Sequence, residues 1–170
     1  QGNGWRQNSK FNTDHTHGEI SYAISNKLKV GAQLTYMQAE SQQAGGLTDV
    51  EFGQNSQQSK RSRNWFSTPW FIYALTADYV INTNSKLSMK YFGTTAERNS
   101  VGFMRAITEV DPKWNLQVDR YLYQTNGAEM RYLLDYRLGS WKNTVATGLR
   151  YFHGEMQRKL VGIGTPNSDL

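Results

Sequence analysis

The sequence predicts an all-β fold, an antiparallel transmembrane β-barrel. Three observations lead to this fold class. Apolar residues recur at every second position over long segments, the turns on one side of these segments are short, and the connections on the other side are long and polar. The mean hydropathy of −0.69 is compatible with such strands, because one face meets lipid and the other a wet lumen. No stretch approaches the roughly 20 apolar residues that a spanning helix needs.

The first strand pair is expected over about 17–40. Apolar residues fall mainly on even positions up to Ile24, and they resume at Leu28 after a short polar turn near Asn26. Alternation on both sides of such a turn predicts a β-hairpin. The other parity carries residues such as Lys29 and Gln33, which suit water or a polar filling.

The second pair is expected over about 63–98. One parity carries most of the apolar side chains from Trp65 to Ile81, and a turn near Asn84 leads into the returning strand. This run is far longer than the roughly 5 to 6 residues of a typical soluble strand. Pro69 has no N–H group to donate, so a bulge or an irregular rim position is expected there.

The third pair is expected over about 123–153, around a turn near Ser140. Its first strand alternates apolar residues with charged ones. A row of charges on one face would be intolerable in the dry core of a sandwich but suits a wet lumen. We expect these side chains to contact a plug domain or each other: Glu129, Arg131, Asp135 and Arg137.

The remaining segments, about 1–16, 41–62, 99–122 and 154–170, are expected to be outer loops, because outer-membrane barrels have short periplasmic turns and longer extracellular loops. About six strands cannot close a barrel, since the smallest have about eight, so the chain is expected to be part of a longer polypeptide. Aromatic residues near the strand ends fit interfacial girdles or reflect aromatic β-propensity. They are Trp65, Trp70, Tyr79, Tyr91, Tyr123, Trp141 and Tyr151.

The net charge of +5 could indicate nucleic acid, an anionic membrane surface or an anionic ligand. Basic residues are scattered along the chain, which favours solvated faces, and the basic run at 60–63 lies in no recognisable nucleic-acid-binding module, so no nucleic-acid partner is expected. The absence of cysteine excludes disulfide frameworks and thiol-ligated metal sites.

No enzymatic motif stands out. The chain has no GxSxG motif, and the glycines at 162 and 164 lack the Lys-Ser/Thr of a phosphate loop. His15 and His17 stand beside Asp14, but an exposed loop end is favoured over a metal site because no third ligand is evident. We expect neither an enzyme nor a bound cofactor.

Several loop segments resemble a known family. The segments QQAGGLTD at 42–49, QQS at 57–59 and RSRNWF at 61–66 resemble a stretch of TonB-dependent outer-membrane receptors of the ferric dicitrate transporter type. Segments 2–11, 97–103 and 164–170 are similar to loops of that family, in consistent order and spacing.

This resemblance implies a barrel of about 22 strands with a plugged lumen, in which the plug domain and TonB box lie outside the present chain. It implies import of an iron chelate, ferric citrate or a ferric siderophore, across the bacterial outer membrane. The implied partners are TonB with its inner-membrane energising complex, and outer-membrane lipid and lipopolysaccharide.

A chelate with exposed carboxylates would be bound by guanidinium groups at the outer mouth, because Arg binds carboxylates in a bidentate, charge-assisted way. The other interpretations are solvated loop charge and attraction to lipopolysaccharide phosphates. A different class of function, a soluble β-sandwich or an adhesin that binds surface glycans, also remains open. The candidate ligand-binding residues are Arg61, Arg63, Arg98 and Arg105, with Gln57 and Gln58 as neutral donors.

Overall fold

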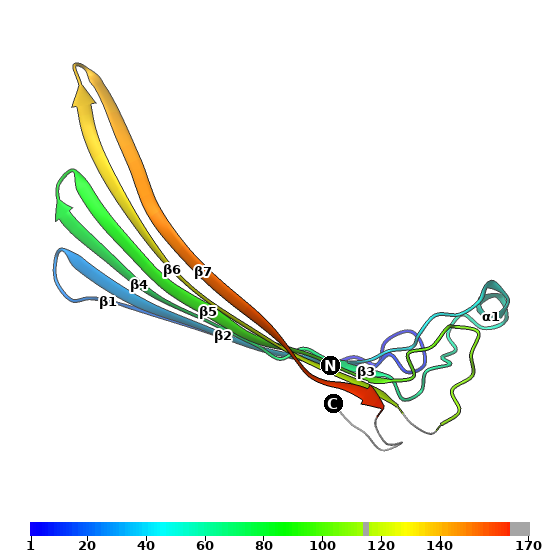
Figure 1. Ribbon diagram of the computed structural model, residues 1–170. Helices are drawn as coiled ribbons and strands as arrows, with labels where there is room; N and C mark the ends of the chain where they lie inside the picture. Colours follow the sequence, from blue (N-terminus) through cyan, green and yellow to red (C-terminus); the bar gives the residue numbers. More distant parts are fainter. Residues whose placement is uncertain (114–115, 164–170) are drawn as a thin grey trace.

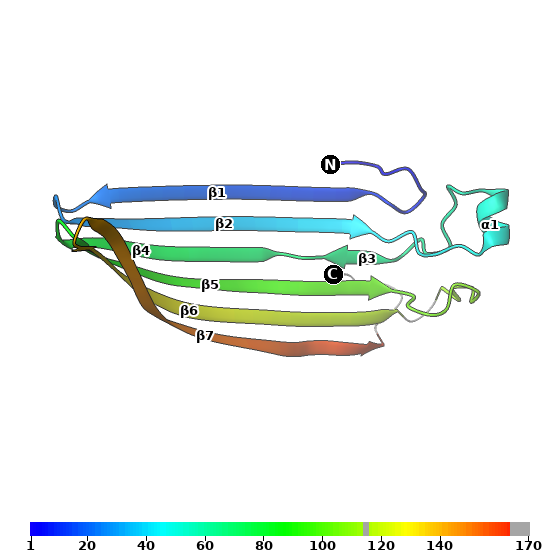
Figure 2. The same ribbon diagram turned by 90° about the horizontal axis from the view of Figure 1, so that it is seen from above.

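The computed structural model describes residues 1–113 and 116–163, with side chains up to residue 158. Within this part the chain forms one antiparallel sheet, which confirms the predicted all-β fold. The strands are β1 (Phe11–Ala23), β2 (Leu28–Gln42), β3 (Trp65–Ser67), β4 (Trp70–Asn82), β5 (Ser85–Gly102), β6 (Gln117–Leu138) and β7 (Trp141–Ile163). They lie side by side in chain order, with β3 and β4 end to end between β2 and β5 (Figure 2).

Tight turns join the strands at one end of the sheet. They lie where the sequence predicts them, near Asn26, Asn84 and Ser140. The last turn has only two residues between β6 and β7, and Gly139 adopts a φ of +59° there, which a side chain would disfavour. The opposite end, here called the outer end, carries the long loops and a short helix, α1 (Asp49–Gln54) (Figure 1).

The strands extend further toward the outer end than the sequence predicts. β1 begins at Phe11, β5 continues to Gly102, β6 begins at Gln117 and β7 reaches Ile163. The segments expected as loops at 99–122 and 154–170 are therefore partly strand, and residues 164–170 lie outside the described residues. Hydropathy alternation becomes irregular near these ends, because polar residues such as Glu97 and Asn99 share a face with the buried Val101, whereas the backbone ladder continues unchanged.

The long strand expected over 63–81 is interrupted. Thr68 and Pro69 separate β3 from β4, and the expected irregular position is confirmed. The Thr68 N–H donates to the Ala39 carbonyl and the Pro69 carbonyl accepts from the Glu97 N–H, so the neighbouring strands satisfy the break. Proline has a carbonyl group that accepts a hydrogen bond but no N–H group that donates one, so the ladder is interrupted at this point.

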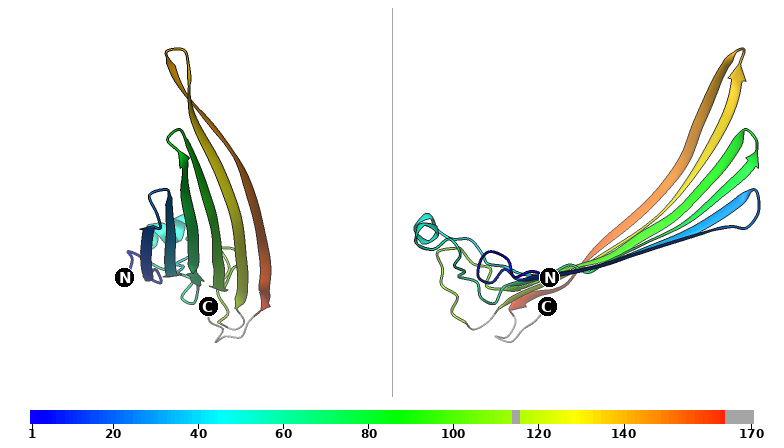
Figure 3. Two further views of the ribbon diagram at one scale, coloured as in Figure 1. Left: turned by 90° about the vertical axis from the view of Figure 1, so that its left-hand side faces the viewer. Right: turned by 180° about the vertical axis from the view of Figure 1, so that it is seen from behind.

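The register sorts side chains onto two faces, because residues directly opposite each other in an antiparallel ladder share a face. One row across the sheet is almost wholly apolar and defines the apolar face: Val30, Ala77, Met89, Met130 and Leu149. The adjacent row defines the polar face: Lys29, Asp78, Ser88, Arg131 and Gly148. The sheet that carries these two faces is curved (Figure 3).

The aromatic side chains divide between these faces. Tyr79, Tyr91 and Tyr151 belong to the apolar face, as an interfacial girdle requires. Trp70 and Tyr123 both pair with Ala96 on the polar face, so the expectation that they belong to such a girdle is wrong. In the described part of the chain no helix combines the length and apolar character needed to cross a membrane.

Candidate functional site

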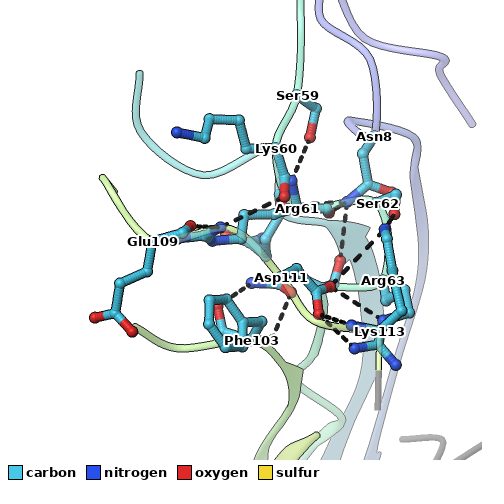
Figure 4. A network of polar contacts seen from close by, with 12 residues as sticks. Asn8, Ser59, Lys60, Arg61, Ser62, Arg63, Phe103, Glu109, Asp111 and Lys113 are labelled. Carbon is cyan, nitrogen blue, oxygen red and sulfur yellow. Dashed lines mark hydrogen bonds and ion pairs between the residues drawn. The ribbon is translucent and has the colours of Figure 1, made fainter. Parts of the chain in front are cut away.

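Three segments gather at the outer end and form what we call the outer loop cluster, residues 1–10, 43–64 and 103–113. The Gln7 N–H donates to the Gln57 carbonyl at 2.8 Å, and the Gln43 N–H donates to the Asn64 carbonyl at 2.8 Å. Side chains then connect these segments in a dense network of polar contacts (Figure 4).

Arg61 lies at the centre of this network and is only 4% exposed. Its guanidinium donates to the carbonyls of Glu109 at 3.1 Å and Ala106 at 2.8 Å, and it lies 4.8 Å from the centre of the Phe103 ring. A further bond goes to the Arg105 carbonyl at 3.2 Å. These bonds occupy the donors that a carboxylate ligand would need, so Arg61 connects two loops rather than facing an open mouth.

Arg63 forms a bidentate ion pair with Asp111, at 3.1 Å from Nε and 2.6 Å from Nη2. Burial raises the pKa of Asp111, but the hydrogen bonds from Arg63 and from the Lys113 N–H outweigh it and hold the pKa below its ordinary value. Arg63 therefore also serves the architecture of the loops, because its charge is neutralised within the cluster.

Helix α1 has a capping box at its start. The Thr48 hydroxyl accepts from the Glu51 N–H, and the Glu51 carboxylate accepts from the Thr48 N–H at 2.9 Å. Lys60 adds an ion pair to Glu51 at 2.6 Å. The Lys60 and Thr48 hydrogen bonds lower the pKa of Glu51 to about 2.

Gln58 is occupied in the same region, since its side chain donates to the Glu51 carbonyl at 2.6 Å and its own carbonyl accepts from Arg6 at 2.8 Å. Gln57 is exposed and contributes backbone bonds. Arg105 is exposed, and within the described part of the chain its side chain forms no hydrogen bond or ion pair. Among the described residues the Gln57 side chain likewise forms no hydrogen bond, so Gln57 and Arg105 keep their side-chain donors available.

A different arrangement occurs on the polar face below the cluster. Arg98 of β5, Tyr121 of β6 and Arg158 of β7 are direct neighbours in the ladder. The guanidinium carbons of Arg98 and Arg158 lie 5.9 and 5.8 Å from the centre of the Tyr121 ring, each arriving from the strand on one side of it. Phe66 lies 5.4 Å from Arg98 and extends the row. We call these four residues the upper row.

The upper row keeps its hydrogen-bonding capacity. Arg98 and Arg158 are exposed, and among the described residues neither guanidinium takes part in a hydrogen bond or ion pair. Cation–π contacts with Tyr121 favour this position, and they do not require the N–H donors of the guanidinium. Arg98, expected at the end of the second strand pair beside an outer loop, lies within β5.

The sequence does not indicate Arg158 as a site residue, because 154–170 is expected to be a loop. The sequence does carry a signal for it, because Arg158 has the same parity as Arg150 and would share its face if the strand continued. The remaining predicted ligand residues do not join the upper row. Arg61, Arg63 and Gln58 bind within the outer loop cluster, and Gln57 and Arg105 lie on its surface.

The four charged residues expected to face the lumen do share the polar face, by their parity on β6. Glu129 pairs with Arg131 at 2.9 Å, and Asp135 accepts from the Thr144 hydroxyl at 2.6 Å. Arg137 lies in a hollow beside the tight turn, together with Asn84 and Lys142. His15 and His17 also belong to this face, whereas Asp14 belongs to the other, so the three cannot converge.

No protein-family model matches the chain, and no curated protein matches it in sequence. Among solved structures it is similar to the crystal structure of the ferric citrate transporter FecA in the unliganded form. The TM-score is 0.82 at 19% sequence identity, and the match covers 98% of this chain and 24% of that one. The chain therefore spans about a quarter of the length of that transporter. This likeness shows the fold, an antiparallel sheet that matches part of a β-barrel.

Proposed function

We propose that this chain forms part of the barrel of a TonB-dependent transporter in the bacterial outer membrane, which imports an iron chelate, ferric citrate or a ferric siderophore, into the periplasm. The observation that carries the proposal is the upper row, where two guanidinium groups with unused donors flank an aromatic ring on the polar face. The fold shared with a ferric citrate transporter supports it.

The apolar face supports a membrane location. On β6 the side chains of this face are apolar or aromatic from Ala128 to Leu138, and polar at Asn126 and Gln124 beyond them. These 11 residues span about 33 Å along the strand, or about 25 Å of height at a tilt of about 40°. That height equals the apolar band of outer-membrane barrels, about 25 Å.

Tyrosine hydroxyls mark the upper edge of this band. Tyr73 and Tyr91 both donate to the Asn126 side-chain oxygen, at 2.5 and 3.3 Å. Tyrosine rings, which are apolar except for the hydroxyl at one end, are characteristic of the boundary between hydrocarbon and headgroups. The upper row, seven residues beyond Ala128 on β6, then lies above the membrane on the lumen side, where an extracellular ligand arrives first.

Growth under iron limitation tests the transport itself. A strain lacking the gene should lose growth on at least one single iron source among ferric citrate and ferric siderophores. Normal growth of the deletion strain on all of them would refute iron transport.

The upper row is tested by binding. In the complete protein, R98Q combined with R158Q should weaken chelate binding roughly 10- to 100-fold, since a hydrogen bond from a charged group contributes about 1.5–3 kcal/mol. The matched control is K10Q combined with K27Q, which removes the same charge from exposed positions in a loop and a turn. Equal binding by the two double variants would contradict the assignment.

A further inference from the structure

A second arrangement of cations and an aromatic ring lies deeper on the same face. Lys90 precedes Arg98 by eight residues on β5, and Arg150 precedes Arg158 by eight residues on β7. An even spacing keeps all four on the polar face, and eight residues correspond to about 26 Å along the strand. The chemistry of the upper row is thus repeated nearer to the tight turns.

Phe92 holds the deeper group together. Lys90 Nζ lies 5.9 Å and the Arg150 guanidinium 5.2 Å from the centre of its ring. The ring reaches toward β7 because Gly127, its direct partner on β6, has no side chain; a Cβ there would lie 2.5 Å from Phe92 Cζ. Residues from two strands therefore converge on one ring across a third.

The carboxylate between the two cations is paired with a different cation. Glu129 is the ladder neighbour of both Lys90 and Arg150, but its side chain binds Arg131 at 2.9 Å. The next acidic group on this face, Asp78, pairs with Lys86 at 3.2 Å. Lys90 and Arg150 are exposed, and they make no hydrogen bond or ion pair among the described residues.

We propose that Lys90 and Arg150, held on Phe92, form a second binding site for a small anion with several carboxylate groups. The Arg150 fork can bind one carboxylate through two N–H groups and the Lys90 ammonium can bind a second as a point charge. Its role in import rests on the proposed function: the site receives the anionic cargo after the upper row releases it. Consecutive sites of moderate affinity let a charged solute enter and also leave.

The test is citrate binding to the complete protein, purified in detergent at low ionic strength. Equilibrium dialysis with radiolabelled citrate should show two bound molecules for the wild type. K90Q combined with R150Q should lose one of them, R98Q combined with R158Q the other, and the control K10Q with K27Q neither. The proposal would be overturned if K90Q/R150Q bound as much citrate as the wild type. It would also be overturned if an acidic segment filled the lumen and occupied the site, because no citrate would then bind there.

Two further measurements keep the outcome independent of folding and of the proposed function. R150K retains the positive charge but lacks the two parallel N–H donors of the guanidinium, so it should bind citrate at the deeper site with roughly tenfold lower affinity. An unfolded barrel would instead lose both sites together. Uptake of ferric citrate at saturation should fall at least fivefold in K90Q/R150Q while affinity at the upper row changes less than twofold. A deletion strain with normal iron use would refute the transport function and leave the citrate stoichiometry standing.

Discussion

Arg63 and Asp111 form a bidentate ion pair across the outer loop cluster, in which the Asp111 side chain is only 2% exposed. Removing one partner of a buried pair leaves an uncompensated charge and costs about 3–5 kcal/mol. We therefore expect R63M to expose the backbone of residues 103–113, measured as faster amide hydrogen exchange. K113M is the control, because Lys113 is 59% exposed and 3.9 Å from the same carboxylate, and it should change exchange little.

Acid should loosen the same loops. The pKa values of Asp111 and Glu51 are lowered in the folded protein, Glu51 to about 2 from 4.5. A lowered pKa stabilises the fold above the unfolded value and loses that effect as the pH falls through the folded value. Protease cleavage in 43–64 and 103–113 should therefore rise between about pH 4.5 and 2. In D111N, whose side chain does not titrate, cleavage in 103–113 should already be high at pH 6 and should not rise further in acid.

Arg61 and Arg98 should respond differently to loss of charge. R61M removes a buried guanidinium that binds backbone carbonyls of 105–109, and should destabilise the cluster by about 2–4 kcal/mol. R98Q should leave hydrogen exchange of the cluster unchanged while weakening chelate binding. If R61M instead weakened binding with unchanged exchange, Arg61 would have to be reassigned as a ligand contact.

The apolar face should tolerate charge according to depth. Met130 lies within the proposed membrane band and Gln124 lies beyond its upper edge, on the same face of β6. M130R should destabilise the barrel folded into lipid vesicles by about 2–4 kcal/mol, and Q124R by about 0–1 kcal/mol, as read from urea unfolding. Equal effects at the two positions would argue against a bilayer around this face.

Gly93 should be intolerant of a side chain. A Cβ at this position would collide with the Tyr73 hydroxyl and lie 2.8 Å from the Asn126 side-chain oxygen, the acceptor of that hydroxyl. G93A should cost about 1–3 kcal/mol of unfolding free energy. Y73L should suppress most of this cost in the double variant, since the smaller side chain vacates the space.

The sequence was sufficient for the fold class and for the tight turns. Alternation with period two, as at Val30 and Met130, survives wherever one face is apolar, and turn residues such as Gly139 mark where it ends. The outer strand ends could not be predicted, because adjacent residues such as Glu97 and Arg98 are both polar and alternation vanishes while pairing continues.

The sequence predicts a type of residue for the candidate site and not its positions. Arginine is the residue type that a carboxylate ligand would require, but the sequence does not distinguish Arg61, buried among carbonyls, from Arg98, which contacts the Tyr121 ring. That difference depends on contacts between residues more than twenty positions apart, such as Arg61 with Glu109. Arg158 joins the site through the β6–β7 register alone.

The ring of Phe92 lying over Gly127 has a consequence for folding. If β6 slipped by two residues against β5, Phe92 would meet Thr125 or Glu129 instead of the glycine, and its ring would have no room to cross the strand. A slip of one residue would turn the glycine to the opposite face. The space left by Gly127 therefore favours the native register of β5 and β6 over registers slipped by one or two residues.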